Sequence, residues 1–506
     1  MTPETAYAEL LKCMKEIALL GNTAGVLGWD QEVYMPAANA PYRAEQESLL
    51  AGMIHHKFTD PQVGEWLAAA ESDKKLTGNL TSDSAVNIRE WRRSYDRSTK
   101  LPQKLVEEMA RVSSNAQVEW VEARKANDFK RFQPWLEKIL KLVQEQAKCY
   151  GYTDHPYDAL LEDYEPGLTT KKLDALFPPL RERLSKLSAK ITSSRRQPNI
   201  SILKRPCPIP AQQAFCRKLA EAIGFDFNRG RIDVSAHPFT TGLGPGDTLI
   251  TTRFEETNFE NAFFSTLHEA GHGIYDQGLP SNLELYGTPR ASAVSLGIHE
   301  SQSRLWENLV GRSRPFWNFF FPELKMAFPG TFDDLSVDQF HFAINHSAPS
   351  FIRTESDEVT YNLHVCLRYE IETDLLAGKL KTTDVPGRWN ELMVKYLGVT
   401  PPNDAQGCLQ DVHWSHGSFG YFPTYTLGNL FSAQFFEAAE KEIGTFGGKF
   451  EQGDFKQLKG WLNKNIHAKG QTYLAGDLCQ QVTGKELSPE PFLKYLEGKF
   501  GTLYGF

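Results

Sequence analysis

The sequence predicts a mostly α-helical globular fold with one small antiparallel β-hairpin. Apolar residues recur every three or four positions through most of the chain, which is the period of an amphipathic helix. A short stretch near the middle is instead rich in Val, Ile, Thr and Phe around a cluster of glycines. With 506 residues, of which 41% are hydrophobic, the chain can bury a large core.

The N-terminal part is expected to be helical throughout. The helical period is clear from Leu105 to Arg124 and from Phe132 to Cys149, and Pro102 suits the start of a helix. Breaks are expected near residues 35–41, 59–61 and 98–102 because each of these segments contains proline. The proline-rich passage from Thr192 to Pro210 is the candidate boundary between this helical portion and the remainder.

The glycine cluster from Gly242 to Gly246 is expected to join two antiparallel strands, Val234 to Thr240 and Thr248 to Phe254. The cluster lacks the Lys-Ser/Thr pair of a phosphate loop, which argues against nucleotide binding.

Helices resume after the hairpin. The first is expected from Phe259 to Gln277, with Asn258 as its N-cap and Gly278 as its stop. Further helices are expected around residues 291–310, 356–376 and 427–442.

Charge and cysteine content limit the partners and the compartment. The formal net charge of −8 argues against nucleic acid or an anionic membrane surface as the main partner. The seven cysteines are scattered without a C-x-x-C pair, which indicates neither a thiolate metal site nor a disulfide framework. No stretch reaches the about 18 to 20 apolar residues needed to span a bilayer, and the N-terminus lacks a leader pattern. A cytoplasmic location is therefore expected.

The strongest motif is His268-Glu269-Ala-Gly-His272, inside the helix expected from Phe259. Four residues advance a helix by about 400°, so both imidazoles project from one face and can share one Zn²⁺. Glu269 follows His268 by about 100°, beside the metal, where its carboxylate can take a proton from the attacking water. Chance would produce the pattern roughly 0.02 times in a chain of this composition. The motif therefore predicts a zinc-dependent hydrolase of the metallopeptidase type.

A catalytic zinc needs a third protein ligand and one open position. His299 and Glu300 lie on a further predicted helix, and either side chain can supply the ligand. Spacing alone does not choose between them.

At this point the sequence resembles the M32 carboxypeptidases, also called carboxypeptidase Taq-like enzymes. The resemblance runs nearly end to end and rests on an ordered series of elements: Trp29 to Pro36, His237-Pro-Phe239, the helix with His268 and His272, His299-Glu-Ser-Gln302, Ile352 to Asp357 (I-R-x-x-A-D), Gly407 to Trp414 (G-x-x-Q-D-x-H-W) and Tyr495 to Phe500.

The resemblance implies Glu300 as the third ligand and one zinc ion per subunit, for which Co²⁺ or Mn²⁺ can substitute. It implies a large helical zincin (gluzincin) fold with a deep active-site cleft beside the small sheet. Residues 1–200 are then an N-terminal portion that covers the cleft and residues 201–506 the zinc-binding catalytic portion, within one continuous domain 1–506. A homodimer is also implied, and so is the removal of single amino acids from peptides with a free C-terminus. Broad specificity is expected if a strand of the enzyme pairs with the substrate backbone.

Two positions depart from the family pattern. Leu249 stands where the D-x-R-x-T element of Asp247 to Thr251 has arginine, so the contribution of that arginine is missing or moved. Ser356 replaces the alanine of I-R-x-x-A-D and adds only a hydroxyl.

An enzyme that trims C-termini must recognise a free carboxylate. Arg353 is the candidate, because a guanidinium offers a planar, permanently charged fork. The ordinary alternative for an arginine is an ion pair with a nearby or a distant acid. His237 is a second candidate for binding substrate, although a histidine before proline at the end of a strand is as often structural.

The negative charge that develops on the scissile carbonyl needs a hydrogen-bond donor. His413, Tyr421 and Tyr425 are the candidates, each with aromatic packing as its structural alternative. The strand from Thr248 to Thr252 is a candidate for pairing with a substrate backbone. Asp276, four residues beyond His272, is a candidate for orienting that ring, although a solvated carboxylate is the ordinary case at such a position.

Two other functions fit the same sequence. One is a zinc oligopeptidase or dipeptidyl carboxypeptidase, which shares the metal site and cuts elsewhere. The other is a non-catalytic helical scaffold that binds peptides, although the candidate ligands and Glu269 are all present.

Overall fold

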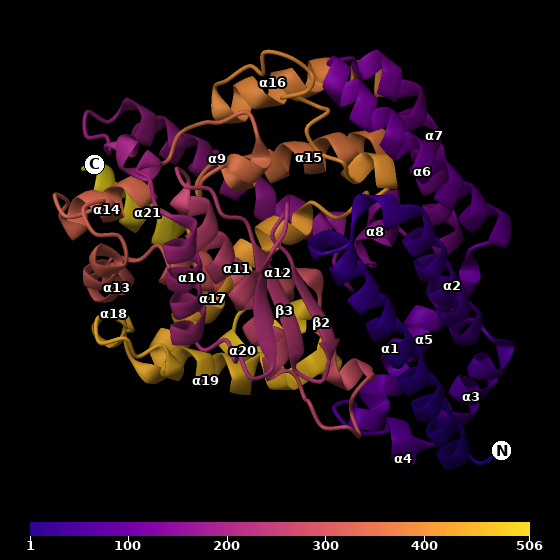
Figure 1. The fold of residues 1–506 in the computed structure, drawn as a ribbon. Helices are drawn as coiled ribbons and strands as arrows, with labels where there is room; N and C mark the ends of the chain where they lie inside the picture. Colours follow the sequence, from indigo (N-terminus) through magenta and orange to yellow (C-terminus); the bar gives the residue numbers. More distant parts are fainter. The chain divides into compact units, whose positions relative to one another are not determined.

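The computed structural model describes all 506 residues, and its elements are helices apart from one three-stranded sheet (Figure 1). The predicted mostly helical class is confirmed. Contacts divide the chain into two units, and each unit combines three stretches of sequence. Unit 1 comprises Met1–Ser98, Pro198–Ile344 and Phe431–Glu486, and unit 2 comprises Thr99–Gln197, Asn345–Leu430 and Leu487–Phe506.

Unit 1 contains the sheet and most of the helices. Its helices are α1 (Pro3–Val33), α2 (Ala40–Phe58), α3 (Pro61–Glu71), α4 (Lys74–Thr77), α5 (Asp83–Lys100), α10 (Ile209–Ile223), α11 (Phe259–Gly278), α12 (Leu296–Arg304), α13 (Arg314–Ala327), α14 (Val337–Ile344), α17 (Pro423–Ile443), α18 (Gly447–Phe450), α19 (Lys456–Asn465) and α20 (Ala475–Thr483). The ends of α5 and α17 continue into unit 2.

Unit 2 is helical. Its helices are α6 (Gln103–Ala126), α7 (Phe129–Tyr150), α8 (Pro156–Leu161), α9 (Thr170–Ser193), α15 (Tyr361–Leu376), α16 (Val385–Leu397) and α21 (Glu490–Tyr504), with short 3₁₀ turns such as η5 (Arg353–Glu355) and η7 (His413–His416).

Local signals explain where α6 and α7 begin and end. Pro102 is the N-cap of α6, and Asn127 ends it in the left-handed conformation with φ of 55°. The side chain of Asp128 caps α7 by accepting a hydrogen bond of 3.3 Å from the amide of Arg131. Both predicted helices are confirmed, and each is slightly longer than its apolar period because the caps lie outside that period.

The sheet is mixed. Its strands are β1 (Gly230–Val234), β2 (Thr240–Gly244) and β3 (Asp247–Thr252), in the order β1-β3-β2. The antiparallel hairpin is confirmed as β2 and β3, while β1 pairs with β3 in parallel. The predicted strand from Val234 to Thr240 is wrong, because β1 ends where it was expected to start and β2 begins where it was expected to end. Pro238 lies in the loop between them, where it has no amide hydrogen for a ladder.

Because β3 is the central strand, both of its edges are already paired. The expectation that residues 248–252 add a substrate strand is therefore wrong, and the free edges of the sheet belong to β1 and β2. One face of β3 packs on α11 (Figure 1), where Thr252 Oγ1 lies 2.6 Å from Ser265 Oγ. A Cβ at Gly273 of α11 would lie 3.3 Å from Ile250 Cγ2, so the helix sits close against the sheet.

Three other predicted helices differ at their starts. The one expected at 291 begins at Leu296, after Ser295 caps the amide of Ile298, and it continues as the π-helical turn η4 (Leu305–Val310). The one expected at 356 begins at Tyr361, because the carboxylate of Asp357 accepts from backbone amides just before it. The one expected at 427 begins earlier, at Pro423.

None of the helices combines the length and apolar composition that crossing a bilayer requires. All seven cysteines are free.

His467 is a fully buried imidazole in unit 1. Its Nδ1 lies 2.6 Å from Asn463 Oδ1 and its Nε2 lies 2.8 Å from Gln302 Oε1. Burial lowers the pKa of His467 to about 3, so the ring stays neutral in the folded protein at pH values where an unfolded histidine is charged.

This burial predicts a loss of stability in acid. Between about pH 6.5 and pH 3 the unfolded chain binds a proton at His467 that the folded chain does not, and folding loses up to about 1.4 kcal/mol per pH unit. In His467→Phe this contribution is absent. We expect urea unfolding to show that wild type loses about 2 kcal/mol more than the variant between pH 6.5 and 4.5. Equal losses in the two proteins would contradict the prediction.

Candidate active site

Three candidate metal ligands come together in unit 1. His268 and His272 project from α11 and Glu300 from α12, and one ligand atom from each lies within 4.8 Å of the others. Glu300 Oε2 is 3.6 Å from His268 Nε2 and 3.4 Å from His272 Nε2. Ligand atoms about 2.0 to 2.1 Å from a tetrahedral zinc lie about 3.3 to 3.4 Å from one another. The three side chains therefore fit the donor types and the spacing of such a site.

The structure distinguishes the two candidates on α12. Both ring nitrogens of His299 have partners, because Nδ1 lies 2.5 Å from His272 Nδ1 and Nε2 lies 2.9 Å from Asp276 Oδ1. Glu300, by contrast, faces the Nε2 atoms of both His268 and His272. Thus Glu300, not His299, completes the group.

A second layer of charges supports the group. Glu307 Oε2 lies 2.8 Å from His268 Nδ1 and therefore orients that ring with its Nε2 toward Glu300. Arg304 Nε donates to Glu300 Oε1 at 2.7 Å, and Arg304 Nη1 donates to Glu307 Oε2 at 3.3 Å. One guanidinium thus holds both carboxylates.

This layer keeps the carboxylates ionised. Burial alone would raise the pKa of Glu307, but Arg304, His268 and Arg312 lower it to about 2. Burial also opposes the charge on Glu300, but Arg304 and the two histidines hold the pKa of this carboxyl well below its usual range. Burial and the neighbouring His299 lower the pKa of His272, which favours the neutral ring that binds metals.

Glu269 is buried beside the group, with 6% of its surface exposed. Thr240 on β2 donates from Oγ1 to Glu269 Oε2 at 2.6 Å and approaches the backbone oxygen of Glu269 at 3.0 Å. The sheet therefore fixes the orientation of this carboxylate and leaves Oε1 as its other oxygen.

The packing of α11 on α12 depends on Gly271. A Cβ at this position would lie 2.7 Å from both the backbone oxygen of Gln302 and the Cα of Ser303. Only glycine lets the two backbones approach this closely. The approach sets the distance between Glu300 and the two histidines.

Unit 2 contains a buried charge cluster around Arg353, which is 4% exposed. Arg353 donates from Nε and Nη2 to Asp411 Oδ1 at 3.1 and 2.8 Å, and from Nη1 to Tyr361 Oη at 2.9 Å. Arg368, which is fully buried, donates from Nε to Asp411 Oδ2 at 2.7 Å. Two guanidinium groups therefore share one carboxylate.

Charge in this cluster is unevenly compensated. Burial opposes the charge on Arg353, but Asp411 raises the pKa of Arg353 above its usual range. Burial lowers the pKa of Arg368 to about 10, and repulsion by Arg353 adds to that effect. Glu372 is another acid that acts on Arg368, and burial raises the pKa of Glu372 to about 7. Below pH 7 the cluster therefore carries a net positive charge.

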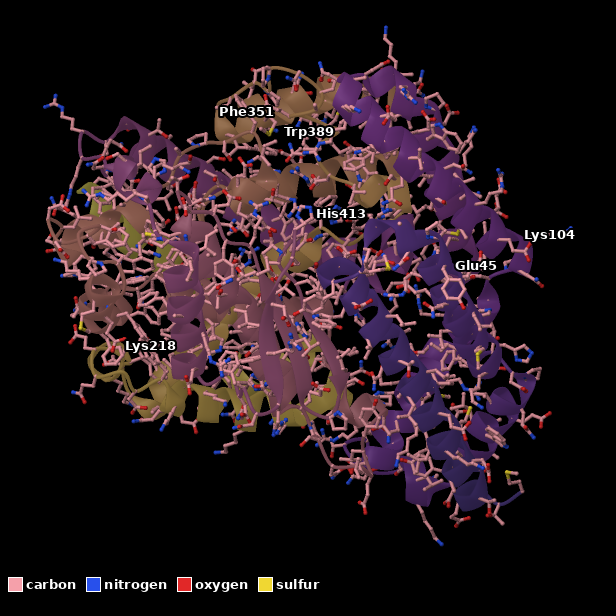
Figure 2. All side chains as sticks on the ribbon, viewed as in Figure 1. Glu45, Lys104, Lys218, Phe351, Trp389 and His413 are labelled. Carbon is pink, nitrogen blue, oxygen red and sulfur yellow. The ribbon has the colours of Figure 1, made fainter.

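The candidate donors His413, Tyr421 and Tyr425 form an aromatic group within unit 2. The His413 ring centroid lies 5.3 Å from that of Tyr421 and 6.4 Å from that of Tyr425. His413 is labelled in Figure 2. Burial, reinforced by Arg353, lowers the pKa of His413 to about 4, so this ring is neutral at physiological pH. The structure thus brings these three candidates together with Arg353, whose Cζ lies 4.8 Å from the Tyr425 ring centroid.

Two positions of unit 1 complete the set of residues identified from sequence. His237 lies in the loop between β1 and β2, where its side chain is exposed and its backbone oxygen accepts from Ser235 Oγ. Leu249 is 7% exposed and pairs in register with Arg231 of β1. An arginine is therefore present on the neighbouring strand, bound to Asp233 and Tyr34.

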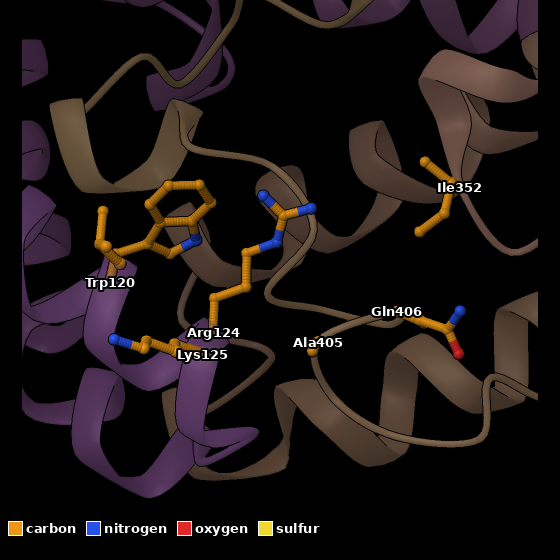
Figure 3. Close-up of a pocket in the computed structure, with 7 residues that line it drawn as sticks. Trp120, Arg124, Lys125, Ile352, Ala405 and Gln406 are labelled. Atoms are coloured by element: carbon orange, nitrogen blue, oxygen red, sulfur yellow. The ribbon is translucent and has the colours of Figure 1, made fainter.

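A surface pocket of about 530 Å³ lies within unit 2 (Figure 3). Its lining residues are Trp120, Val121, Arg124, Lys125, Ile352, Ala405 and Gln406. None of them is a predicted site residue, although Ile352 immediately precedes Arg353.

Sequence reasoning missed Thr240, Arg304, Glu307 and the Asp411 to Arg353 pair. Glu300, Arg304 and Glu307 follow the i, i+4, i+7 spacing of one helical face, which is a signal available in the sequence. The Thr240 contact and the pair with Asp411 join residues 29 and 58 positions apart, so no local pattern indicates them.

The known proteins that this chain resembles in sequence and structure are carboxypeptidases. The model of the carboxypeptidase Taq (M32) metallopeptidases matches residues 9–500. Thermostable carboxypeptidase 1 of Thermus thermophilus is 46% identical over all of both chains, and carboxypeptidase 1 of Bacillus subtilis is 36% identical, also over all of both chains. The crystal structure of an M32 carboxypeptidase from Deinococcus radiodurans R1 is 40% identical, with a TM-score of 0.96, 99% of this chain and 100% of that chain covered. Similarity therefore extends over the whole chain.

The contact at Gly271 gives a prediction about the ligand group. Gly271→Ala forces α11 and α12 apart, and we expect unfolding to be easier by about 1 to 3 kcal/mol and metal affinity to fall. Denaturant unfolding of the metal-free protein and titration with Zn²⁺ measure the two effects. Gly460→Ala on α19 is the control, because nothing lies within 4 Å of its Cβ position. Unchanged metal affinity in Gly271→Ala would contradict this account of helix spacing.

Proposed function

Since the chain belongs to the carboxypeptidase Taq (M32) family of metallopeptidases, which are hydrolases acting on peptides, we propose that it is a zinc-dependent metallocarboxypeptidase. It releases single C-terminal amino acids from peptides with broad specificity. The observation that carries the proposal is the convergence of His268, His272 and Glu300 next to the buried carboxylate of Glu269.

In this proposal His268 Nε2, His272 Nε2 and Glu300 hold one Zn²⁺ per subunit. Two imidazoles and one carboxylate are the usual protein ligands of a catalytic zinc that keeps one position open. The bound metal supplies Lewis-acid polarisation of the scissile carbonyl and makes water more acidic. Co²⁺ and Mn²⁺ accept the same donor types and are proposed as substitutes.

Glu269 is the proposed general base and then general acid. Its carboxylate takes a proton from the attacking water as the oxygen of that water bonds to the carbonyl carbon. The C–N bond then breaks, and the same proton passes to the leaving amine. The hydrogen bond from Thr240 to Glu269 Oε2 supports this role, because it holds the carboxylate in one orientation and leaves Oε1 for the proton.

Arg353 is the proposed binding group for the terminal carboxylate. Its support is the net positive charge of its cluster, where two buried arginines share Asp411. An anion that reaches this cluster balances the excess charge, and a substrate carboxylate has the planar shape that a guanidinium fork binds. His413, Tyr421 and Tyr425 lie near Arg353, and their role as donors to the developing oxyanion stays a prediction.

Broad specificity requires contacts that ignore substrate side chains. The outer edge of β2 is the proposed backbone-binding edge, since β2 is an edge strand and carries Thr240 next to Glu269. His237, in the loop that precedes β2, is a further proposed contact with substrate.

We further propose a homodimer in the cytoplasm. The dimer is implied by the resemblance to the family, and seven free cysteines fit a reducing compartment. Sizing by light scattering tests the dimer.

The role of Glu269 yields the decisive experiment. Glu269→Gln keeps the shape of the side chain and removes its ability to accept a proton, so we expect hydrolysis to slow by about 10² to 10⁴-fold or more. Metal analysis should still find one zinc per subunit. A variant that binds zinc and hydrolyses peptides at the wild-type rate would refute the proposed mechanism, and a wild-type protein without hydrolysis would indicate a scaffold.

Recognition of the carboxylate is tested with peptide pairs that carry a free or an amidated C-terminus. Wild type should cleave the amide far more slowly. In Arg353→Met we expect cleavage of the free acid to slow by about 10 to 100-fold, since each hydrogen bond to a charged group contributes about 1.5 to 3 kcal/mol, and the preference over the amide should largely disappear.

Arg388→Met, which removes ion pairs with Glu370, Asp374 and Glu391 in the same unit, is the matched control and should keep the preference. Wild type that cleaves both peptides equally would instead favour an oligopeptidase. If Arg353→Met still prefers the free acid to the amide, a group other than Arg353 binds the terminal carboxylate of the substrate.

A further inference from the structure

The two candidate histidine ligands are supported in different ways. His268 contacts a carboxylate directly, through Glu307. Through its Nδ1 atom His272 contacts a second imidazole, His299, whose Nε2 atom lies against a carboxylate, Asp276. The outer residues are mostly shielded from water, since the side chains of His299 and Asp276 are 22% and 18% exposed.

The carboxylate at the end of this chain determines where the protons lie. Asp276, when ionised, only accepts hydrogen bonds, so Nε2 of His299 carries the proton that it donates. In the neutral form of His299 the Nδ1 atom is then an acceptor, so across the 2.5 Å contact the donor must be Nδ1 of His272. In this tautomer the remaining nitrogen of His272, Nε2, carries no proton, and this atom faces Glu300 Oε2 at 3.4 Å.

We propose that His299 and Asp276 are positioning residues that select the tautomer of His272 whose Nε2 faces the metal. The inference rests on the proposed metal site and adds residues that no ligand assignment includes. In this proposal His272 donates a hydrogen bond to His299, and His299 donates one to Asp276.

Packing holds the middle ring in place. The His299 ring centroid lies 5.2 Å from that of Tyr275 and 4.5 Å from that of His272. The hydroxyl of Tyr275 in turn accepts a hydrogen bond of 3.1 Å from the amide of Val294, just before α12. We therefore expect position 299 to accept a planar side chain of similar size. A substitution there can remove the hydrogen bonds of the ring without leaving a cavity.

Two substitutions at this position separate polarity from packing. Phenylalanine keeps a ring and removes both hydrogen bonds. Glutamine keeps their direction, because its oxygen accepts from His272 and its amide donates to Asp276. In the holoenzyme we expect His299→Phe to weaken Zn²⁺ binding by about 10 to 100-fold, the usual effect of losing an outer partner of a metal ligand. We expect His299→Gln to stay within a few-fold of wild type.

The readouts are the Zn²⁺ dissociation constant by chelator competition, the visible absorption spectrum of the Co²⁺-loaded protein, and unfolding of the metal-free protein. The control is His467→Phe, which removes another buried imidazole that packs on Tyr275, at 4.9 Å, without touching a candidate ligand. It should leave zinc affinity and the cobalt spectrum unchanged.

The outcomes are distinct. Zinc affinity that falls in His299→Phe, with the metal-free protein as stable as wild type and His299→Gln restored, supports the relay. Affinity that is unchanged in His299→Phe, equally weak in both variants, or equally weak in His467→Phe overturns it. A wild-type protein that binds no zinc refutes the proposed metal site itself.

Discussion

The close approach of α11 and α12 is the constraint on which the candidate site depends. Two ligands and the candidate base belong to α11, and the third ligand belongs to α12, so the group exists only while the two helices stay at this distance. Gly271 permits the approach, because any side chain there meets the backbone of Gln302 and Ser303. The sheet acts on the other side of α11, where Thr240 fixes the carboxylate of Glu269. The H-E-x-x-H motif supplies two candidate ligands and the candidate base, but only the packing of α12 and the sheet against α11 adds the third ligand and orients the base.

The negative charges that this packing buries are compensated by neighbouring cations and hydrogen bonds. Burying Glu269, Glu300 and Glu307 in one site would be unfavourable unless cations or hydrogen bonds compensated their charges. Arg304 contacts two of these carboxylates, and the histidines contact both as well. The compensation is incomplete without a metal, because these three carboxylates face only two arginines, Arg304 and Arg312. An incompletely neutralised acidic group with imidazole donors is the arrangement that favours a divalent cation.

Much of the fold and part of the candidate site were predictable from the sequence. The helix of His268 and His272, its stop at Gly278 and the helices around α6 and α7 follow from local periodicity and caps, which the sequence contains. The parallel strand β1 was missed because pairing with β3 joins strands far from a tight turn. Spacing left His299 and Glu300 equivalent, since adjacent residues on a helix differ only in the direction they face once the helix is packed. The Asp411 partner of Arg353 and the Thr240 partner of Glu269 are long-range contacts, which no local pattern specifies.

The two units show opposite charge balances, and each balance by itself indicates a ligand. In unit 1 the three carboxylates of Glu269, Glu300 and Glu307 outnumber the two nearby arginines, Arg304 and Arg312, which favours a cation. In unit 2 Arg353 and Arg368 share the carboxylate of Asp411, and burial raises the pKa of the further acid Glu372 to about 7, so below pH 7 the balance favours an anion. Hydrolysis at a peptide C-terminus needs both, a metal to polarise a carbonyl and a cationic group to hold the terminal carboxylate. A zinc peptidase that cuts within chains needs only the first. Under the proposed role of Arg353, the buried positive charge around it is the feature that distinguishes a carboxypeptidase from an oligopeptidase.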